Sequence, residues 1–70
     1  MGDPSDDPTY REMVRQAKLV AAGGAAVRRD ELIRELKGNG WDLRDIAQGA
    51  EISIDAVAKI CNPSARQDGQ

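Results

Sequence analysis

The sequence predicts an all-α domain of about four short helices, of which the last two are joined by a tight turn. The chain has 70 residues, enough for one small domain. It contains no Phe, one Trp and one Tyr, so its core must be built from aliphatic residues. This composition favours helices over a sheet sandwich, and apolar residues recur at helical spacing along most of the chain.

The two ends of the chain are polar and are predicted to lie outside the folded domain. Residues 1–8 contain two prolines, a glycine and the acidic residues Asp3, Asp6 and Asp7. Such a segment has little to bury, so we expect a disordered acidic tail. Asn62-Pro63 ends the last helix, and residues 63–70 are predicted to be a loose tail. The helical domain is therefore expected over residues 9–62.

A first amphipathic helix is predicted from Thr9 to the glycine pair Gly23-Gly24. Thr9 and Glu12 have the spacing of a capping box. Apolar residues then recur at helical spacing, namely Tyr10, Met13, Val14, Ala17, Val20 and Ala21. Two roles are open for this helix: it covers one side of the core, or it forms a dimer contact.

A second helix is predicted over residues 26–37. Its inward residues are Leu32, Ile33 and Leu36. Asp30 and Arg34 are spaced for an ion pair on its surface. Residues 38–40, Gly-Asn-Gly, predict that a residue in the left-handed conformation ends this helix. Trp41 follows directly and is expected to be the largest core residue, which closes the gap to the last two helices.

The last two helices are predicted on either side of residues 51–53. Their inward residues are Ile46, Ala47 and Ala50 in the first helix and Val57 and Ile60 in the second, with Ile52 beneath the turn. Ala47 is small, as a close helix crossing requires. Asp42 and Ser53 stand where each helix needs an N-terminal cap, and Asp55 suits the positive end of the helix dipole.

These residues carry a resemblance to a known family. Residues 28–62 resemble the three-helix DNA-binding unit of bacterial helix-turn-helix regulators and of resolvase and transposase tails, in which Ile-Ala, Ser, Val and Ile recur as they do at Ile46, Ala47, Ser53, Val57 and Ile60. Glu51 departs from the family, which commonly has glycine there. Either Glu51 adopts a left-handed conformation, or Gly49 takes up the turn.

The resemblance implies a small sequence-specific protein that binds double-stranded DNA, as a transcriptional regulator or a recombination accessory factor of bacterial or phage type. Residues 53–62 would enter the major groove. The candidates for base contact are Ser53, Ile54, Asp55, Ala58, Lys59 and Asn62. The candidates for contact with the DNA backbone are Arg28, Arg29, Lys37 and Arg44.

The charge of the chain sets a limit on this interpretation. Ten basic and twelve acidic residues give a net charge of −2. The three tail aspartates contribute −3, so the rest carries +1. One copy has few cations for phosphates, which favours binding as a homodimer or with a larger protein partner. The alternative is a protein-interaction module that docks on a larger protein. Asp55 and Ala58 favour that alternative, and the basic residues from Arg28 to Arg44 favour DNA.

Other classes of function lack their usual residues. The sequence has no His and a single cysteine, Cys61, so neither a zinc site nor an internal disulfide is expected. It offers no nucleophile beside a base and no phosphate loop, and we expect no enzyme activity, cofactor or metal. No apolar run reaches about eighteen residues and the start is acidic, which predicts a cytoplasmic protein without a membrane segment.

Overall fold

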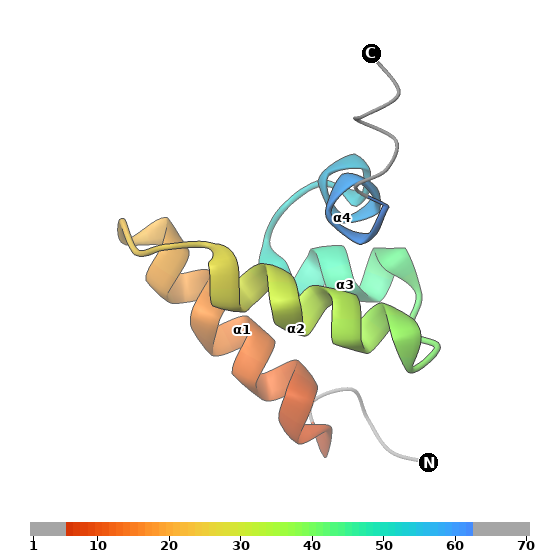
Figure 1. The fold of residues 1–70 in the computed structure, drawn as a ribbon. Coiled ribbons are helices and arrows are strands. Elements are labelled where there is room, and N and C mark those ends of the chain that lie inside the picture. The colour runs from red at the N-terminus through yellow and green to blue at the C-terminus, as the bar shows by residue number, and fades with distance from the viewer. Residues whose placement is uncertain (1–5, 63–70) are drawn as a thin grey trace.

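The computed structural model describes residues 6–62, which form four helices and no strand. The helices are α1 (Pro8–Ala21), α2 (Val27–Gly38), α3 (Leu43–Ala50) and α4 (Ile54–Cys61) (Figure 1). The predicted all-α class is confirmed. None of these helices is both long and apolar enough to cross a membrane. Residues 1–5 of the tail predicted at residues 1–8, and all of the tail predicted at residues 63–70, lie outside the described part of the chain.

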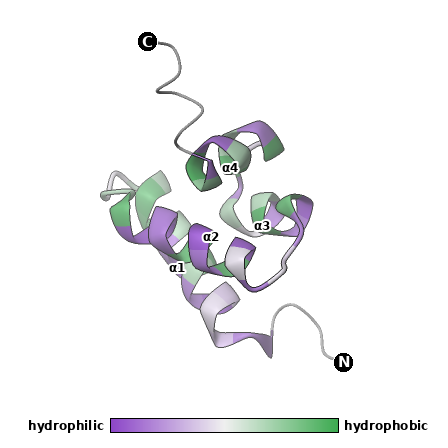
Figure 2. Ribbon diagram, turned by 45° about the vertical axis from the view of Figure 1, so that its right-hand side comes forward, coloured by the Kyte–Doolittle hydropathy of each residue, from purple (hydrophilic) through white to green (hydrophobic). Residues whose placement is uncertain are grey.

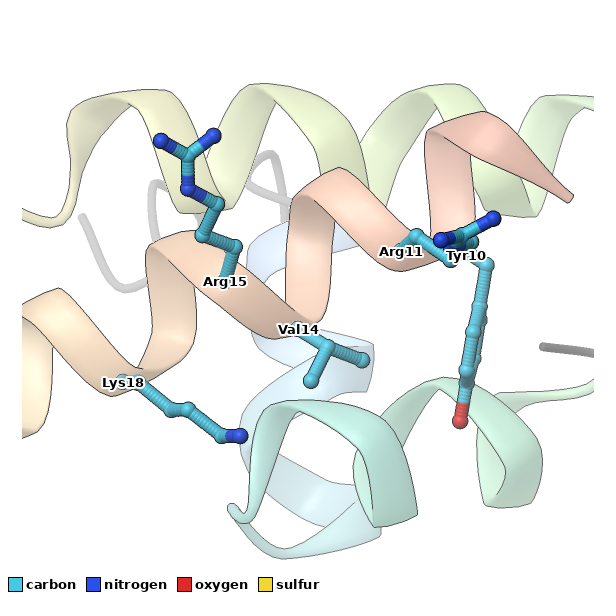
Figure 3. A pocket seen from close by; sticks show the side chains of 5 residues that line it. All are labelled: Tyr10, Arg11, Val14, Arg15 and Lys18. Carbon is cyan, nitrogen blue, oxygen red and sulfur yellow. The ribbon is translucent and has the colours of Figure 1, made fainter.

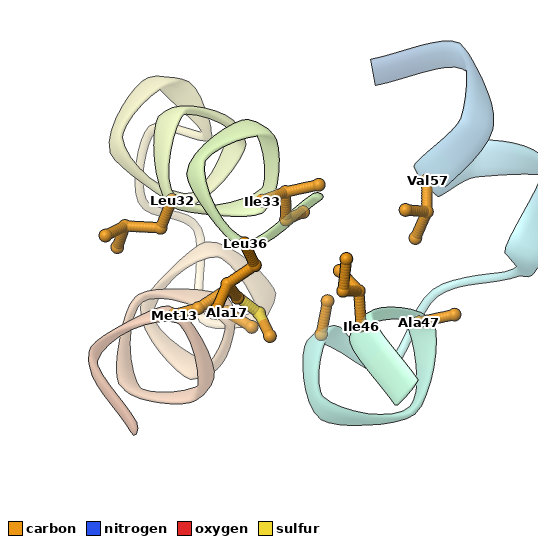
Figure 4. Packing of buried hydrophobic residues seen from close by; sticks show 9 residues of the cluster. Met13, Ala17, Leu32, Ile33, Leu36, Ile46, Ala47 and Val57 are labelled. Carbon is orange, nitrogen blue, oxygen red and sulfur yellow. The ribbon is translucent and has the colours of Figure 1, made fainter. Parts of the chain in front are cut away.

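A single hydrophobic core receives side chains from all four helices. Its buried members are Met13, Ala17, Leu32, Ile33, Leu36, Ile46, Ala47, Ala50 and Val57. Seen along the helices, α1 and α4 lie diagonally across from each other (Figure 4). Val57 points from α4 towards Ile46 of α3, and Ile33 of α2 faces the same gap (Figure 4). The inward positions predicted for α2 and α3 are thus confirmed, and α1 covers one side of the core.

The start of α1 differs from the prediction. Pro8 is its first residue, and the side chain of Asp7 accepts a hydrogen bond of 2.9 Å from the Thr9 amide. The predicted capping box is therefore wrong, as is the placement of Pro8 in the tail. Proline suits the first helical position, because its missing N–H would have had no partner in the helix. Glu12 instead accepts from Gln16 at 2.8 Å and pairs with Arg15 at 3.5 Å.

The first three helices end in the same kind of turn. A left-handed residue follows each of them, and these residues are Gly23 (φ 109°), Gly40 (φ 99°) and Glu51 (φ 60°). The next amide donates to a carbonyl five positions earlier, at 2.8 to 3.1 Å, as in a Schellman motif. Of the two alternatives for the last turn, the first is confirmed: Glu51 takes the left-handed conformation and Gly49 stays within α3.

The two predicted caps of the last helices behave differently. The hydroxyl of Ser53 accepts from the Ala56 amide at 3.1 Å, so the cap of α4 is confirmed. Asp42 occupies the capping position of α3 but its side chain accepts no capping hydrogen bond. Asp42 is exposed to solvent, so its carboxylate can accept hydrogen bonds from water in place of one from a backbone amide.

Tyr10 connects α1 to α3 and to the segment between α2 and α3. Its ring stacks on Trp41, with centroids 4.8 Å apart and planes at 10°, and its hydroxyl donates to the Asp45 carbonyl at 3.1 Å. Burial raises the pKa of this hydroxyl, and the charge of Asp45 adds to the effect. Trp41 is only half-buried at the edge of the core, so its prediction as the largest core residue is wrong: the indole covers Tyr10 instead of filling the centre.

Gly49 of α3 lies directly against the Tyr10 side chain of α1. A Cβ added there would overlap the Tyr10 hydroxyl oxygen and lie 2.7 Å from Tyr10 Cζ. Gly38, also helical, has nothing within 4 Å of such an added atom. The two glycines therefore provide a matched pair: one is required by a tertiary contact and the other is not.

We expect Gly49→Ala to lower the free energy of unfolding by about 1 to 3 kcal/mol, because the new methyl group forces Tyr10 and α1 away from α3. Gly38→Ala should leave it unchanged or raise it by up to about 1 kcal/mol, the usual benefit of alanine in a helix. Urea denaturation followed by circular dichroism measures both. Equal effects of the two substitutions would show that α1 does not dock on α3 in this way.

Glu51→Gly should raise the free energy of unfolding by about 1 kcal/mol, because glycine adopts φ near 60° without steric cost. Glu51→Ala is the control: it removes the same charge but keeps a Cβ in the left-handed region, so it should change stability by less than about 0.5 kcal/mol. Thermal denaturation of both variants tests this. A stabilising alanine variant would assign the effect to charge and not to backbone conformation.

Candidate nucleic-acid interface

Helix α4 is anchored to the domain along one side and exposed along the other. Val57 is fully buried, while Ile54, Asp55, Lys59 and Asn62 are exposed and Ala58 is half-buried. Positions 54, 58 and 62 are four residues apart, as are positions 55 and 59, and each of the two rows lies along one side of a helix next to the other row. The cap Ser53 is exposed at the N-terminal end of this side, and we call these six residues the α4 face.

The α4 face offers groups of different chemistry. Ile54 is 48% exposed, an unusual exposure for a large hydrophobic side chain. Asp55 can only accept hydrogen bonds while it is ionised, and Lys59 can only donate them. In a DNA groove these groups would suit a thymine methyl, a cytosine amino group and a guanine or phosphate, respectively. The face is therefore chemically varied but carries no excess of positive charge.

Two cations lie beside the C-terminal end of α4. Arg34 of α2 donates from Nε to the Ile60 carbonyl at 3.2 Å, which gives one of the last carbonyls of α4 a partner. Burial raises the pKa of the Cys61 thiol, while Lys37 and Arg34 act in the opposite direction. Both cations are thus close enough to Cys61 to influence it. The sequence alone missed Arg34, because 26 residues separate it from Ile60.

The four candidates for backbone contact fall into two groups. Arg44, at the start of α3, and Lys37, near the end of α2, are exposed and form no ion pair within residues 6–62. Arg28 is also exposed but pairs with Glu31 at 3.2 Å.

Arg29 differs from the other three candidates. Its side chain is only 14% exposed, and its guanidinium donates twice to Asp30, at 2.9 and 3.1 Å. We therefore leave Arg29 out of the candidate interface. The predicted Asp30–Arg34 pair is wrong, because Asp30 pairs with Arg29 and Arg34 donates to α4.

A hollow lies on α1, on the opposite side of the core from α4. It is lined by Tyr10, Arg11, Val14, Arg15 and Lys18. Tyr10, Val14 and Lys18 point towards α3, whereas Arg15 points away from it (Figure 3). The three cations, Arg11, Arg15 and Lys18, all line this hollow, at spacings of four and three residues along α1. Since α1 lies diagonally across from α4, this hollow is separate from the α4 face (Figure 4).

The described part of the chain holds no candidate metal centre. Among residues 6–62, no three His, Cys, Asp or Glu side chains come close enough together to hold a metal ion. The chain matches no protein family model, no curated protein and no solved structure. Its function is therefore argued from the α4 face and the cations beside it.

Replacement of Arg34 tests how α4 is held. Arg34→Ala should lower the free energy of unfolding by about 1 kcal/mol, because it removes a charged donor from the last turn of α4. The control is Arg11→Ala, which removes an exposed side chain that forms no hydrogen bond or ion pair within residues 6–62. Urea denaturation should separate the two variants; if both resemble the parent protein, the bond to Ile60 contributes nothing to stability.

Proposed function

We propose that this protein binds double-stranded DNA through the α4 face, as a small regulator or accessory factor that acts by occupying its site. The observation that carries the proposal is the exposure of one whole side of α4 beside a three-residue turn from α3. The major groove is wide enough to admit an α-helix, and base edges there are distinguished by donor, acceptor and methyl positions. The varied groups of the α4 face match such a surface.

The roles of the residues follow from their chemistry and position. Lys59 would donate to guanine or to a phosphate, Ile54 would contact a thymine methyl, and Asp55 would accept from cytosine. Arg44 would contact the backbone near the start of α3, and Lys37 near the end of α4. Backbone contacts set the position of a protein on the duplex, and base contacts select the sequence.

One observation favours a second function, docking on a larger protein. The α4 face holds one exposed cation, Lys59, one exposed anion, Asp55, and one exposed large hydrophobic side chain, Ile54. An apolar centre flanked by opposite charges suits a protein surface as well as a groove. The two functions differ in their dependence on salt, because DNA binding releases counterions from phosphates.

Selection of bound sequences from a random pool of DNA duplexes tests the first function directly. We expect one motif to be enriched, and binding to that motif to weaken steeply as the salt concentration rises. Failure to enrich any motif, with salt-independent association with a protein, would favour docking instead.

Substitution of single cations then tests the proposed contacts of Arg44 with the DNA backbone and of Lys59 on the α4 face. Arg44→Ala should weaken binding to all duplexes similarly and reduce the slope of log K against log salt by about one for each copy bound. Lys59→Ala should cost about 1 to 3 kcal/mol on the selected duplex and less on a scrambled one if it contacts guanine. Lys18→Ala is the matched control, since it removes an exposed cation from α1. Equal effects of Lys18→Ala and Lys59→Ala would contradict the proposal.

A further inference from the structure

The most exposed large hydrophobic side chains of residues 6–62 include two that lie together where α1 ends and α2 begins. Leu19 is 51% exposed and Val27 is 68% exposed. Both line one hollow, together with the small residues Ala22 and Ala25 of the connection. Figure 2 shows this part of the ribbon in the green of hydrophobic residues. We call these four residues the junction patch.

The core of the domain does not require the junction patch to be apolar. The buried cluster and the hydrophobic residues packed against it include neither Leu19 nor Val27. Exposed apolar side chains gathered in one place gain free energy when a partner covers them, about 25 cal/mol for each Å² removed from water. Because neither side chain packs against the core, both are available to contact a partner.

The rim of the junction patch indicates which partner fits. Arg28 and Glu31 line the same hollow, and their side chains lie 3.2 Å apart with 56% and 52% exposure. The rim thus presents one positive and one negative group. Because these two groups form a neutral ion pair within α2, the rim favours neither a polyanion nor a polycation. In a two-fold symmetric pair, Arg28 of each copy can lie opposite Glu31 of the other, because such an interface pairs residue i with j and j with i.

We propose that the junction patch is a self-association surface, at which two copies of this chain pair about a two-fold axis. Leu19 and Val27 of each copy cover those of the other, and Arg28 and Glu31 form crossed ion pairs at the rim. The hollow on α1 lacks this self-complementarity, because its charged lining residues, Arg11, Arg15 and Lys18, are all positive. Two such surfaces would repel each other.

The size of the patch sets the strength of the pairing. Stable dimers commonly bury about 800 Å² on each partner, from about 20 to 30 residues, whereas the junction hollow is lined by eight. The dimer should therefore be weak and should depend on protein concentration. If the proposed DNA function holds, a duplex with two half-sites would hold both copies and strengthen the pairing. Self-association itself does not rest on that function.

Sedimentation equilibrium without DNA tests the proposal, because its outcome does not depend on whether the protein binds DNA. The parent protein should change from monomer to dimer as its concentration rises. Val27→Asp should weaken association at least tenfold, and an acidic residue at the start of α2 is compatible with the helix dipole. Ile54→Asp is the matched control: it makes the same kind of change at the first residue of α4 and should leave association unchanged. Thermal denaturation verifies that both variants fold.

Charge reversal tests the crossed ion pairs. Arg28→Glu alone and Glu31→Arg alone should each associate at least tenfold more weakly than the parent, because each places like charges opposite each other. An equimolar mixture of the two variants should form a heterodimer at least as tight as the parent dimer, since an all-negative rim then meets an all-positive one. A parent protein that stays monomeric at every concentration, equal behaviour of Val27→Asp and Ile54→Asp, or a mixture no tighter than its components would each overturn the proposal.

Discussion

The close approach of α1 to α3 at Gly49 is the constraint on which the rest of the packing depends. Because Gly49 has no side chain, the Tyr10 ring lies directly against the backbone of α3, and its hydroxyl reaches the Asp45 carbonyl. This approach brings Met13 and Ala17 into the core beside Ile46. A domain with so little apolar volume has few other ways to bury it. With α1 in place, α3 is held on one side and can support α4 on the other.

The sequence predicted the features that arise from periodicity and local backbone preference. The inward positions of α2 and α3, the Ser53 cap and the turn after Gly40 follow from residues within one or two helical turns of each other. The choice at Glu51 could not be made from the sequence, because both alternatives were sterically allowed. The structure shows that the left-handed residue is Glu51, at a steric cost that the surrounding packing must offset.

Features that depend on tertiary contacts were predicted poorly. Trp41 was expected inside the core because of its size. Its position after α2 instead puts it at the edge of the core, where its ring stacks on that of Tyr10. Asp30 has two arginines within reach, and only the fold decides that Arg34 turns to α4 while Arg29 takes the carboxylate. In the candidate interface, the spacing predicted that the exposed residues of α4 share one face. The spacing did not predict which cations are available to a ligand, because it does not show that Arg28 pairs with Glu31 and Arg29 with Asp30.

The stacked pair of Tyr10 and Trp41 also gives the protein an optical property. The chain contains one Trp and one Tyr, and their rings lie 4.8 Å apart across the boundary between α1 and the connection from α2 to α3. Both ultraviolet chromophores therefore occupy the same contact. Separation of α1 from the domain would remove the Tyr10 ring from the indole and expose that face of Trp41 to water. Tryptophan emission consequently reports the docking of one helix, whereas the far-ultraviolet signal reports the helical content of all four.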